Sequence, residues 1–176
     1  MARLRSLLRS LRIWSVVVVL LSRLWWDGRN WTYLSGASEA AVERRQRRLA
    51  RWLLHELLGL GSAFIKLGQL LSARPDLLPA PWVEQLAQLQ DRVPSFPFPQ
   101  AQALLESELG PRRSEIVRIE PNPLGSASLA QVHRATLRCG RDVVLKLQRP
   151  GLERLFRLDL HVMEQVAAVL QRHPNW

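Results

Sequence analysis

The sequence contains little cysteine and little lysine, and it lacks long apolar runs. Its 176 residues include a single cysteine, which excludes an intramolecular disulfide and any site built from several cysteines. The histidines have no metal-ligand spacing among themselves; they are His55, His133, His161 and His173. With 47% hydrophobic and 23% charged residues, the composition is nevertheless that of a folded protein, and the length fits one domain with or without an appendage.

The shortage of lysine makes two positions conspicuous. Of the 25 basic residues, 23 are arginine and two are lysine, Lys66 and Lys146. An ammonium is a compact charge that fits a narrow pocket or a phosphate oxygen, whereas a guanidinium is broad and forked. A genome-wide codon bias accounts for most of the imbalance, so two ordinary surface lysines are the alternative. The two lysines are still the first candidates for a site.

The positive charge is concentrated at the start of the chain. The formal net charge is +10, and residues 1–51 contribute +8 of it, from 11 arginines and three acidic residues. The remaining residues are nearly neutral. The sequence therefore predicts a neutral folded body with a basic front end.

The front end predicts contact with a membrane surface. The apolar run Ile13–Leu21 is about half the roughly 20 residues needed to cross a bilayer, and no small-residue cleavage site follows it. Trp14, Trp25 and Trp26 suit the headgroup level, and the arginines suit anionic lipid. We therefore expect residues 1–37 to form a basic aromatic segment in the membrane interface. The alternatives are an ordinary helix packed on the body and a nucleic-acid binder, for which no recognised motif is present.

The rest of the chain predicts an α+β protein. Apolar periodicity, glycines and prolines indicate helices over 38–60, 62–73, 79–89 and 99–109, so that 38–110 forms a helical extension. Two strands follow, over 128–137 and 142–148, with a turn at Cys139-Gly140. A long amphipathic helix over 152–172 completes the segment 111–176, and the last four residues resemble a linker more than a domain end.

A loop of small residues precedes the first strand. It has the form G-x-A-x-x-A and consists of Gly125, Ser126, Ala127, Ser128, Leu129 and Ala130. Loops of this kind let backbone N–H groups approach phosphates closely, and alanine removes only the freedom for positive φ. Taken alone, the loop favours a structural turn.

The order of elements around Lys146 favours a nucleotide site. A loop, a strand, a turn, the strand Val143-Val144-Leu145-Lys146 and a long helix follow one another as in a protein-kinase N-lobe, where the strand lysine pairs with the α- and β-phosphates. A second motif lies in the helix over 62–73, where Lys66 and Gln69 share a face beside Gly68. A glycine within a helix costs about 1 kcal/mol relative to alanine, which indicates a close approach of another element.

These segments resemble one known family. Lys66-Leu67-Gly68-Gln69 with Ser72–Pro79 resembles the KxGQ region of the UbiB/AarF (ADCK-type) atypical kinases. Gly125–His133 resembles their alanine-rich nucleotide loop, Val143–Gly151 their strand-lysine segment, and Leu89–Pro94 also belongs to the pattern. The resemblance extends from about residue 40 to the end, with the motifs in the family's order.

The resemblance implies a kinase-like protein that binds ATP with Mg²⁺ and supports isoprenoid quinone (ubiquinone or plastoquinone) biosynthesis. It implies that Lys146 binds phosphate, that Gly125–Ala130 cover the nucleotide, and that Lys66 and Gln69 of the KxGQ helix enter the pocket. It also implies a membrane-associated protein at the cytoplasmic face, of bacterial or plastid type.

The family's ExD motif, catalytic aspartate and metal-binding aspartate do not occur after Lys146. We therefore expect no catalytic residue and no metal ligand in this chain, a kinase C-lobe that is absent or supplied by a separate chain, and an inactive N-lobe fragment. A non-catalytic membrane-associated helical scaffold is the alternative. Nucleic-acid binding ranks last, because the basic excess does not extend over the folded body.

Overall fold

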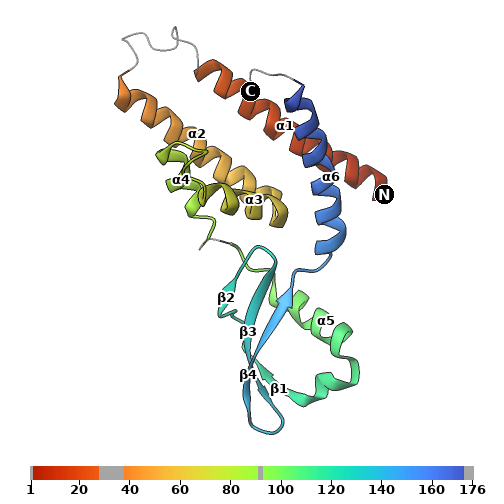
Figure 1. Cartoon of the computed structure of the whole chain (residues 1–176). Helices are drawn as coiled ribbons and strands as arrows, with labels where there is room; N and C mark the ends of the chain where they lie inside the picture. Colours follow the sequence, from red (N-terminus) through yellow and green to blue (C-terminus); the bar gives the residue numbers. More distant parts are fainter. Residues whose placement is uncertain (1, 28–37, 91–92, 173–176) are drawn as a thin grey trace. The chain divides into compact units, whose positions relative to one another are not determined.

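The computed structural model describes residues 2–27, 38–90 and 93–172 (Figure 1). Predictions for residues 28–37, for Asp91 and Arg92, and for the last four residues lie outside this range. The chain forms two compact units, which are described separately. Unit 1 consists of residues 1–89 and 154–176, and unit 2 consists of residues 90–153.

Unit 1 is helical. It contains α1 (Ala2–Asp27), α2 (Glu39–Leu60), α3 (Ser62–Ser72), α4 (Ala80–Ala87) and the greater part of α6 (Leu152–Gln171). Ser38 caps α2, because its hydroxyl oxygen accepts a hydrogen bond from the Ala41 N–H at 3.3 Å. Gly61, with φ of 89°, ends α2 and donates its N–H to the Leu57 carbonyl. The helices predicted from periodicity over 38–60 and 62–73 are confirmed to within a residue or two.

The core of unit 1 is built on the apolar stripe of α2. Six residues of this helix are buried: Leu49, Ala50, Leu53, Leu54, Leu57 and Leu60. Phe64 and Ile65 of α3 and Trp82 and Leu86 of α4 are also buried in this unit. Burial of such side chains contributes about 1.5–3 kcal/mol each, so helix packing stabilises the unit.

Unit 2 contains the sheet. Its elements are α5 (Phe98–Leu109), the 3₁₀ helix η2 (Gly110–Glu115), β1 (Ile116–Ile119), β2 (Gly125–Ser126), β3 (Ala130–Leu137) and β4 (Asp142–Gln148). All strand pairs are antiparallel: β4 pairs along the length of β3, while β1 and β2 pair with successive parts of β3. The predicted hairpin of β3 and β4 is confirmed. The two short strands β1 and β2 were not predicted from the sequence.

The two faces of the sheet differ. Leu147 packs in a core with Phe96, Ala101 and Leu105, and Leu145 lies partly buried against that core. Helix α5 therefore covers this face. Because side chains alternate along a strand, Val144 and Lys146 of β4 point to the opposite face, where both are exposed.

Helices combined with a small antiparallel sheet make the chain α+β, as expected. From the sequence we expected three segments, 1–37, 38–110 and 111–176. The boundaries of the two compact units fall at other residues. Helix α5 belongs with the sheet, and most of α6 belongs with the helical unit. In the described ranges, no helix is both long and apolar enough to cross a bilayer.

Candidate functional site

The register of the sheet aligns the small-residue loop with the strand lysine. Gly125 of β2 is the partner of Val132 of β3, and Val132 is in turn the partner of Lys146 of β4. The three residues therefore form one row across the sheet. Neighbouring strands lie about 4.8 Å apart, so the first residue of the loop and the backbone of Lys146 are roughly 10 Å apart. Two segments separated in sequence thus lie side by side in the sheet.

Lys146 is exposed on the sheet face that α5 does not cover. Among the described residues, no hydrogen bond or ion pair holds its ammonium group. An ammonium with three donors and no protein partner is available to an anionic ligand above this face.

The loop itself is a tight turn that alanine can adopt. The Ala127 N–H donates to the Ala130 carbonyl at 2.7 Å, and the Leu124 N–H donates to the Val132 carbonyl at 2.8 Å. None of the described non-glycine residues has positive φ, and Gly125 does not have it either. A Cβ added to Gly125 would meet no atom within 4 Å. The alanines of the G-x-A-x-x-A form therefore fit without backbone strain.

Arg149 forms hydrogen bonds that hold the loop Gly125–Ala130 in place. The sequence analysis did not assign this role to it. Its guanidinium donates to the Pro94 carbonyl, to the Ser126 hydroxyl at 3.2 Å and to the Ala127 carbonyl at 3.3 Å. Its backbone N–H donates to the Leu129 carbonyl at 3.0 Å. Burial lowers the pKa of the Arg149 guanidinium, which stays charged. The loop is held in place by a residue three positions after Lys146.

A buried polar chain supports the other face of the sheet. Gln131 accepts a hydrogen bond from the Phe96 N–H at 2.9 Å, and its amide group donates to the Phe96 carbonyl at 3.2 Å and to Nε2 of His133 at 2.9 Å. The hydrogen-bond pattern fits the His133 tautomer with a proton on Nδ1, which donates to the Glu120 carbonyl at 2.8 Å. Both side chains are fully buried. They have a structural role that joins β3 to the connector before α5.

The KxGQ residues lie in unit 1, on α3. A Cβ added to Gly68 would overlap the side chain of Leu89 and lie 2.8 Å from Cδ1 of Leu57, so the predicted close approach is confirmed. Gln69 donates its amide N–H to the Leu89 carbonyl at 3.0 Å. Lys66 is exposed, next to Leu67 and Leu70, which are also exposed. Gly68 and Gln69 thus fix α3 in unit 1, while Lys66 is left on the surface.

Helix α1 has an exposed apolar face. Eight large apolar residues of this helix are exposed and lie on one side of it: Leu4, Leu7, Leu8, Leu11, Val18, Val19, Trp25 and Trp26. Ile13 and Val16 are buried on the opposite side.

The described arginines of α1 contact other helices of unit 1. Arg9 pairs with Asp159, Arg12 reaches Gly59, and Arg23 lies 4.5 Å from the ring centroid of Trp52. The sequence had suggested that such arginines face lipid. The structure gives α1 an outer face that is apolar instead.

The described residues form no acidic or mixed cluster that could ligate a metal: no group of three or more His, Cys, Asp or Glu side chains is suitably placed. The site in unit 2 consists of a backbone loop, an exposed lysine and an anchoring arginine. Backbone N–H groups and an ammonium are donors that can bind an anion.

A helical unit and a small antiparallel sheet that presents a loop and a lysine are consistent with a kinase-like N-lobe. The sequence model of the ABC1 atypical kinase-like domain matches residues 88–175. The chain belongs to this family.

Its relatives include longer proteins of bacteria and chloroplasts. An uncharacterized protein of Synechocystis sp. is 47% identical over 96% of this chain and 29% of its own length. Protein ACTIVITY OF BC1 COMPLEX KINASE 7, chloroplastic, of Arabidopsis thaliana is 45% identical over 97% of this chain and 25% of its own. A probable protein kinase UbiB of Azotobacter vinelandii is 41% identical over 97% of this chain and 33% of its own length. The chain therefore spans about a quarter to a third of these relatives, in their N-terminal part.

Proposed function

We propose that this chain is the ATP-binding N-terminal part of a UbiB-like atypical kinase or ATPase that supports isoprenoid quinone biosynthesis. The row formed by Gly125, Val132 and Lys146 is the observation that carries the proposal. It brings a loop of small residues next to an exposed ammonium that has no partner among the described residues. Kinases use such a pair to cover the nucleotide and to bind its α- and β-phosphates.

In this proposal the loop and the lysine bind different parts of the nucleotide. Lys146 neutralises charge on the phosphates, while the turn at Gly125–Ala130 covers the nucleotide with its backbone. Arg149 holds this turn through the carbonyls of Pro94 and Ala127. A turn that is already ordered loses little entropy when the nucleotide binds, which supports affinity.

The proposal assigns Mg²⁺ a place beside the phosphates, where it would neutralise charge during phosphoryl transfer. The described residues above the open face supply no carboxylate cluster for it. The resemblance assigns the metal ligands and the catalytic aspartate to the kinase C-lobe. We therefore assign this chain nucleotide binding without turnover, and we assign catalysis to a C-lobe.

The KxGQ residues extend the proposal to regulation. Gly68 and Gln69 anchor α3 through Leu89, and Lys66 remains exposed. We propose that Lys66 reaches the nucleotide pocket in the assembled kinase and alters nucleotide choice. Quinone biosynthesis enters the proposal through the relatives named UbiB. The exposed apolar face of α1 supports action at a membrane surface, where such substrates dissolve.

A fluorescent ATP analogue titrated against the 176-residue chain tests the nucleotide site. Lys146→Arg should weaken binding by about tenfold, because the forked guanidinium does not fit the position of a point charge. Lys66→Arg should leave the affinity for the analogue within about twofold, because an exposed swap of this kind changes little.

Arg134→Ala is the matched control, because Arg134 is exposed on the same sheet face, in the row of Val144. It removes a positive charge there and should leave the affinity nearly unchanged. Superimposable curves for wild type and Lys146→Arg would refute the site. An equal loss for Arg134→Ala and Lys146→Ala would indicate non-specific attraction of an anion and would also refute it.

A further inference from the structure

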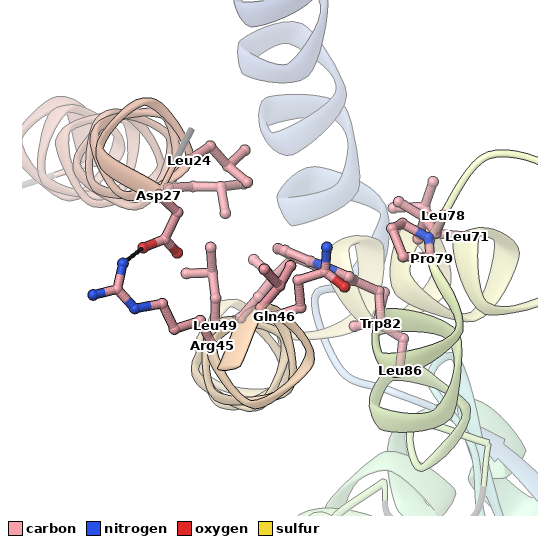
Figure 2. Close-up of a pocket in the computed structure, with 13 residues that line it drawn as sticks. Leu24, Asp27, Arg45, Gln46, Leu49, Leu71, Leu78, Pro79, Trp82 and Leu86 are labelled. Carbon is pink, nitrogen blue, oxygen red and sulfur yellow. Dashed lines mark hydrogen bonds and ion pairs between the residues drawn. The ribbon is translucent and has the colours of Figure 1, made fainter. Parts of the chain in front are cut away.

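Unit 1 contains a large cavity that the nucleotide proposal does not use. It lies between α1, α2 and the region from the end of α3 into α4, and it has a volume of about 460 Å³. Figure 2 shows side chains from α1, α2 and α4 directed into it. Small-molecule sites are typically about 300–1,000 Å³, so the size suits an organic ligand.

The walls of the cavity are apolar. Ten of the thirteen lining residues are aliphatic or aromatic: Leu20, Leu24, Val42, Leu49, Leu53, Leu71, Leu78, Pro79, Trp82 and Leu86. Water gains few hydrogen bonds in such a space, and an apolar chain that displaces it is stabilised by the area removed from water. The walls therefore favour a hydrocarbon ligand.

The polar lining is confined to three residues. Asp27 and Arg45 form an ion pair at 3.2 Å, with about a third of each side chain exposed. Because each charge compensates the other, this end of the cavity has no net charge for an ionic ligand. Gln46 offers an amide donor and a carbonyl acceptor between this pair and the apolar side formed by Leu78, Pro79 and Trp82 (Figure 2).

We propose that this cavity binds a single-chain amphiphile with an uncharged polar head. The tail lies against the leucines and Trp82, and the head, a hydroxyl or carbonyl group, bonds to Gln46 beside the Asp27–Arg45 pair. All thirteen lining residues belong to unit 1, so the proposal does not depend on the nucleotide site of unit 2. Failure of one proposal leaves the other standing.

Bromododecanol is a direct probe, because bromine quenches tryptophan fluorescence on contact and Trp82 lines the cavity. Titration of the full chain should give saturable quenching, and unbrominated dodecanol should reverse it. Trp82→Phe should remove most of the quenching while keeping an aromatic wall. Quenching that is unchanged in Trp82→Phe would place the alcohol elsewhere and overturn the proposal.

Two adjacent leucines provide a matched pair of variants. Leu78 lines the cavity, whereas Leu77 does not line it and is 57% exposed. Leu78→Asp should raise the apparent Kd about tenfold or more, since an unpaired charge is costly on an apolar wall. Leu77→Asp should leave the Kd within about twofold. Circular dichroism of both variants verifies folding, and equal losses in two folded variants would overturn the proposal.

A third comparison tests the head group. Bromododecanol should bind more tightly than ionised bromododecanoate, and Asp27→Asn, which removes the carboxylate beside Arg45, should improve the relative affinity for the anion. Tighter binding of the anion to wild type would overturn the assignment of an uncharged head. Delivery from buffer and from phosphatidylcholine vesicles distinguishes a dissolved ligand from one taken from a bilayer. Quenching by either route supports the cavity, and quenching by neither overturns it.

Discussion

Arg9 of α1 and Asp159 of α6 form a two-point ion pair, with Nε to Oδ1 at 2.5 Å and Nη2 to Oδ2 at 2.6 Å. Asp159 is 1% exposed, and Arg9 also donates to the Leu60 carbonyl at the end of α2. One guanidinium thus connects three helices of unit 1. Parallel hydrogen bonds between arginine and a carboxylate are the strong form of such a pair.

Removing one partner of this pair should be costly. Arg9→Met leaves the buried carboxylate uncompensated and should lower the free energy of unfolding by about 3 kcal/mol, as measured by urea denaturation. The double variant with Asp159→Leu should regain much of that loss. The exposed pair Arg74 and Asp76 is the control, and Asp76→Asn should leave the urea midpoint unchanged. A double variant no more stable than Arg9→Met would contradict this account.

The contact between Gly68 and Leu89 predicts a steric effect. Gly68→Ala should destabilise unit 1 by about 1–3 kcal/mol, because the new methyl group overlaps Leu89 and crowds Leu57. Gly125→Ala is the matched control, since a Cβ there meets open space. It should change the unfolding midpoint little or raise it slightly. Thermal denaturation of both variants decides the matter, and equal shifts would be inconsistent with the contact.

Gln131 should be essential to unit 2. Gln131→Leu fills similar space but leaves the Phe96 N–H and carbonyl without their partners, at a cost of about 2–4 kcal/mol. Amide hydrogen exchange should show the Phe96 N–H less protected than in wild type. The outward-facing neighbour variant Val132→Thr should have a much smaller effect on unfolding. Unchanged protection of Phe96 in Gln131→Leu would argue against the network.

Cys139 should be alkylated at a lower pH than an ordinary thiol. Its pKa is lowered by a hydrogen bond from the Arg141 backbone N–H, followed by a hydrogen bond from the Arg141 side chain. A lower pKa means more thiolate at a given pH, so the iodoacetamide rate should rise earlier in a pH series. Arg141→Ala should move the profile to higher pH only in part, because the backbone donor remains. A profile identical to that of a short cysteine peptide would refute this prediction.

The outer face of α1 should bind vesicles mainly through apolar contact. Leu8→Ser combined with Leu11→Ser should lower partition into phosphatidylglycerol-containing vesicles about tenfold or more, because buried leucines contribute about 1.5–3 kcal/mol each. Raising the salt concentration should lower partition by less than the two serine substitutions do. Arg9, Arg12 and Arg23 contact other helices of unit 1 and are therefore not directed at lipid. Serine substitution of Val117 and Val144, which are exposed in unit 2, is the control. Equal losses from both pairs of changes would contradict a specific α1 surface.

Local patterns predicted the parts of the fold that depend on local physics. Periodicity and capping placed α2 and α3, and a turn at Gly140, with φ of 81°, placed the β3–β4 hairpin. Strand β2 escaped prediction because two residues, Gly125 and Ser126, carry no alternating pattern and pair only through β3. The order of the elements predicted that the loop and Lys146 belong to one nucleotide site, whereas their common row with Val132 follows from strand register.

The anchoring residues could not be predicted in the same way. Arg149 contacts Pro94, 55 positions earlier, and nothing in the local sequence distinguishes it from the other arginines. Gln131 lies within the motif Gly125–His133, yet its bond to Phe96 depends on a connector 35 positions away. Such contacts form only when tertiary packing brings distant segments together. A short window of sequence contains one partner and not the other, so it cannot predict the contact.

The pair of Arg9 and Asp159, 150 positions apart, also has a consequence for the order of events on the ribosome. Chains grow at about 5–20 residues per second, so Arg9 is made roughly 8 to 30 seconds before the carboxylate that it needs. Residues 90–153 contain every strand that the described part of the chain forms, and they are synthesised before most of α6. The sheet can therefore form while the first helix still lacks its partner. The first helix to be made therefore acquires its buried ion pair only after residue 159 has been made.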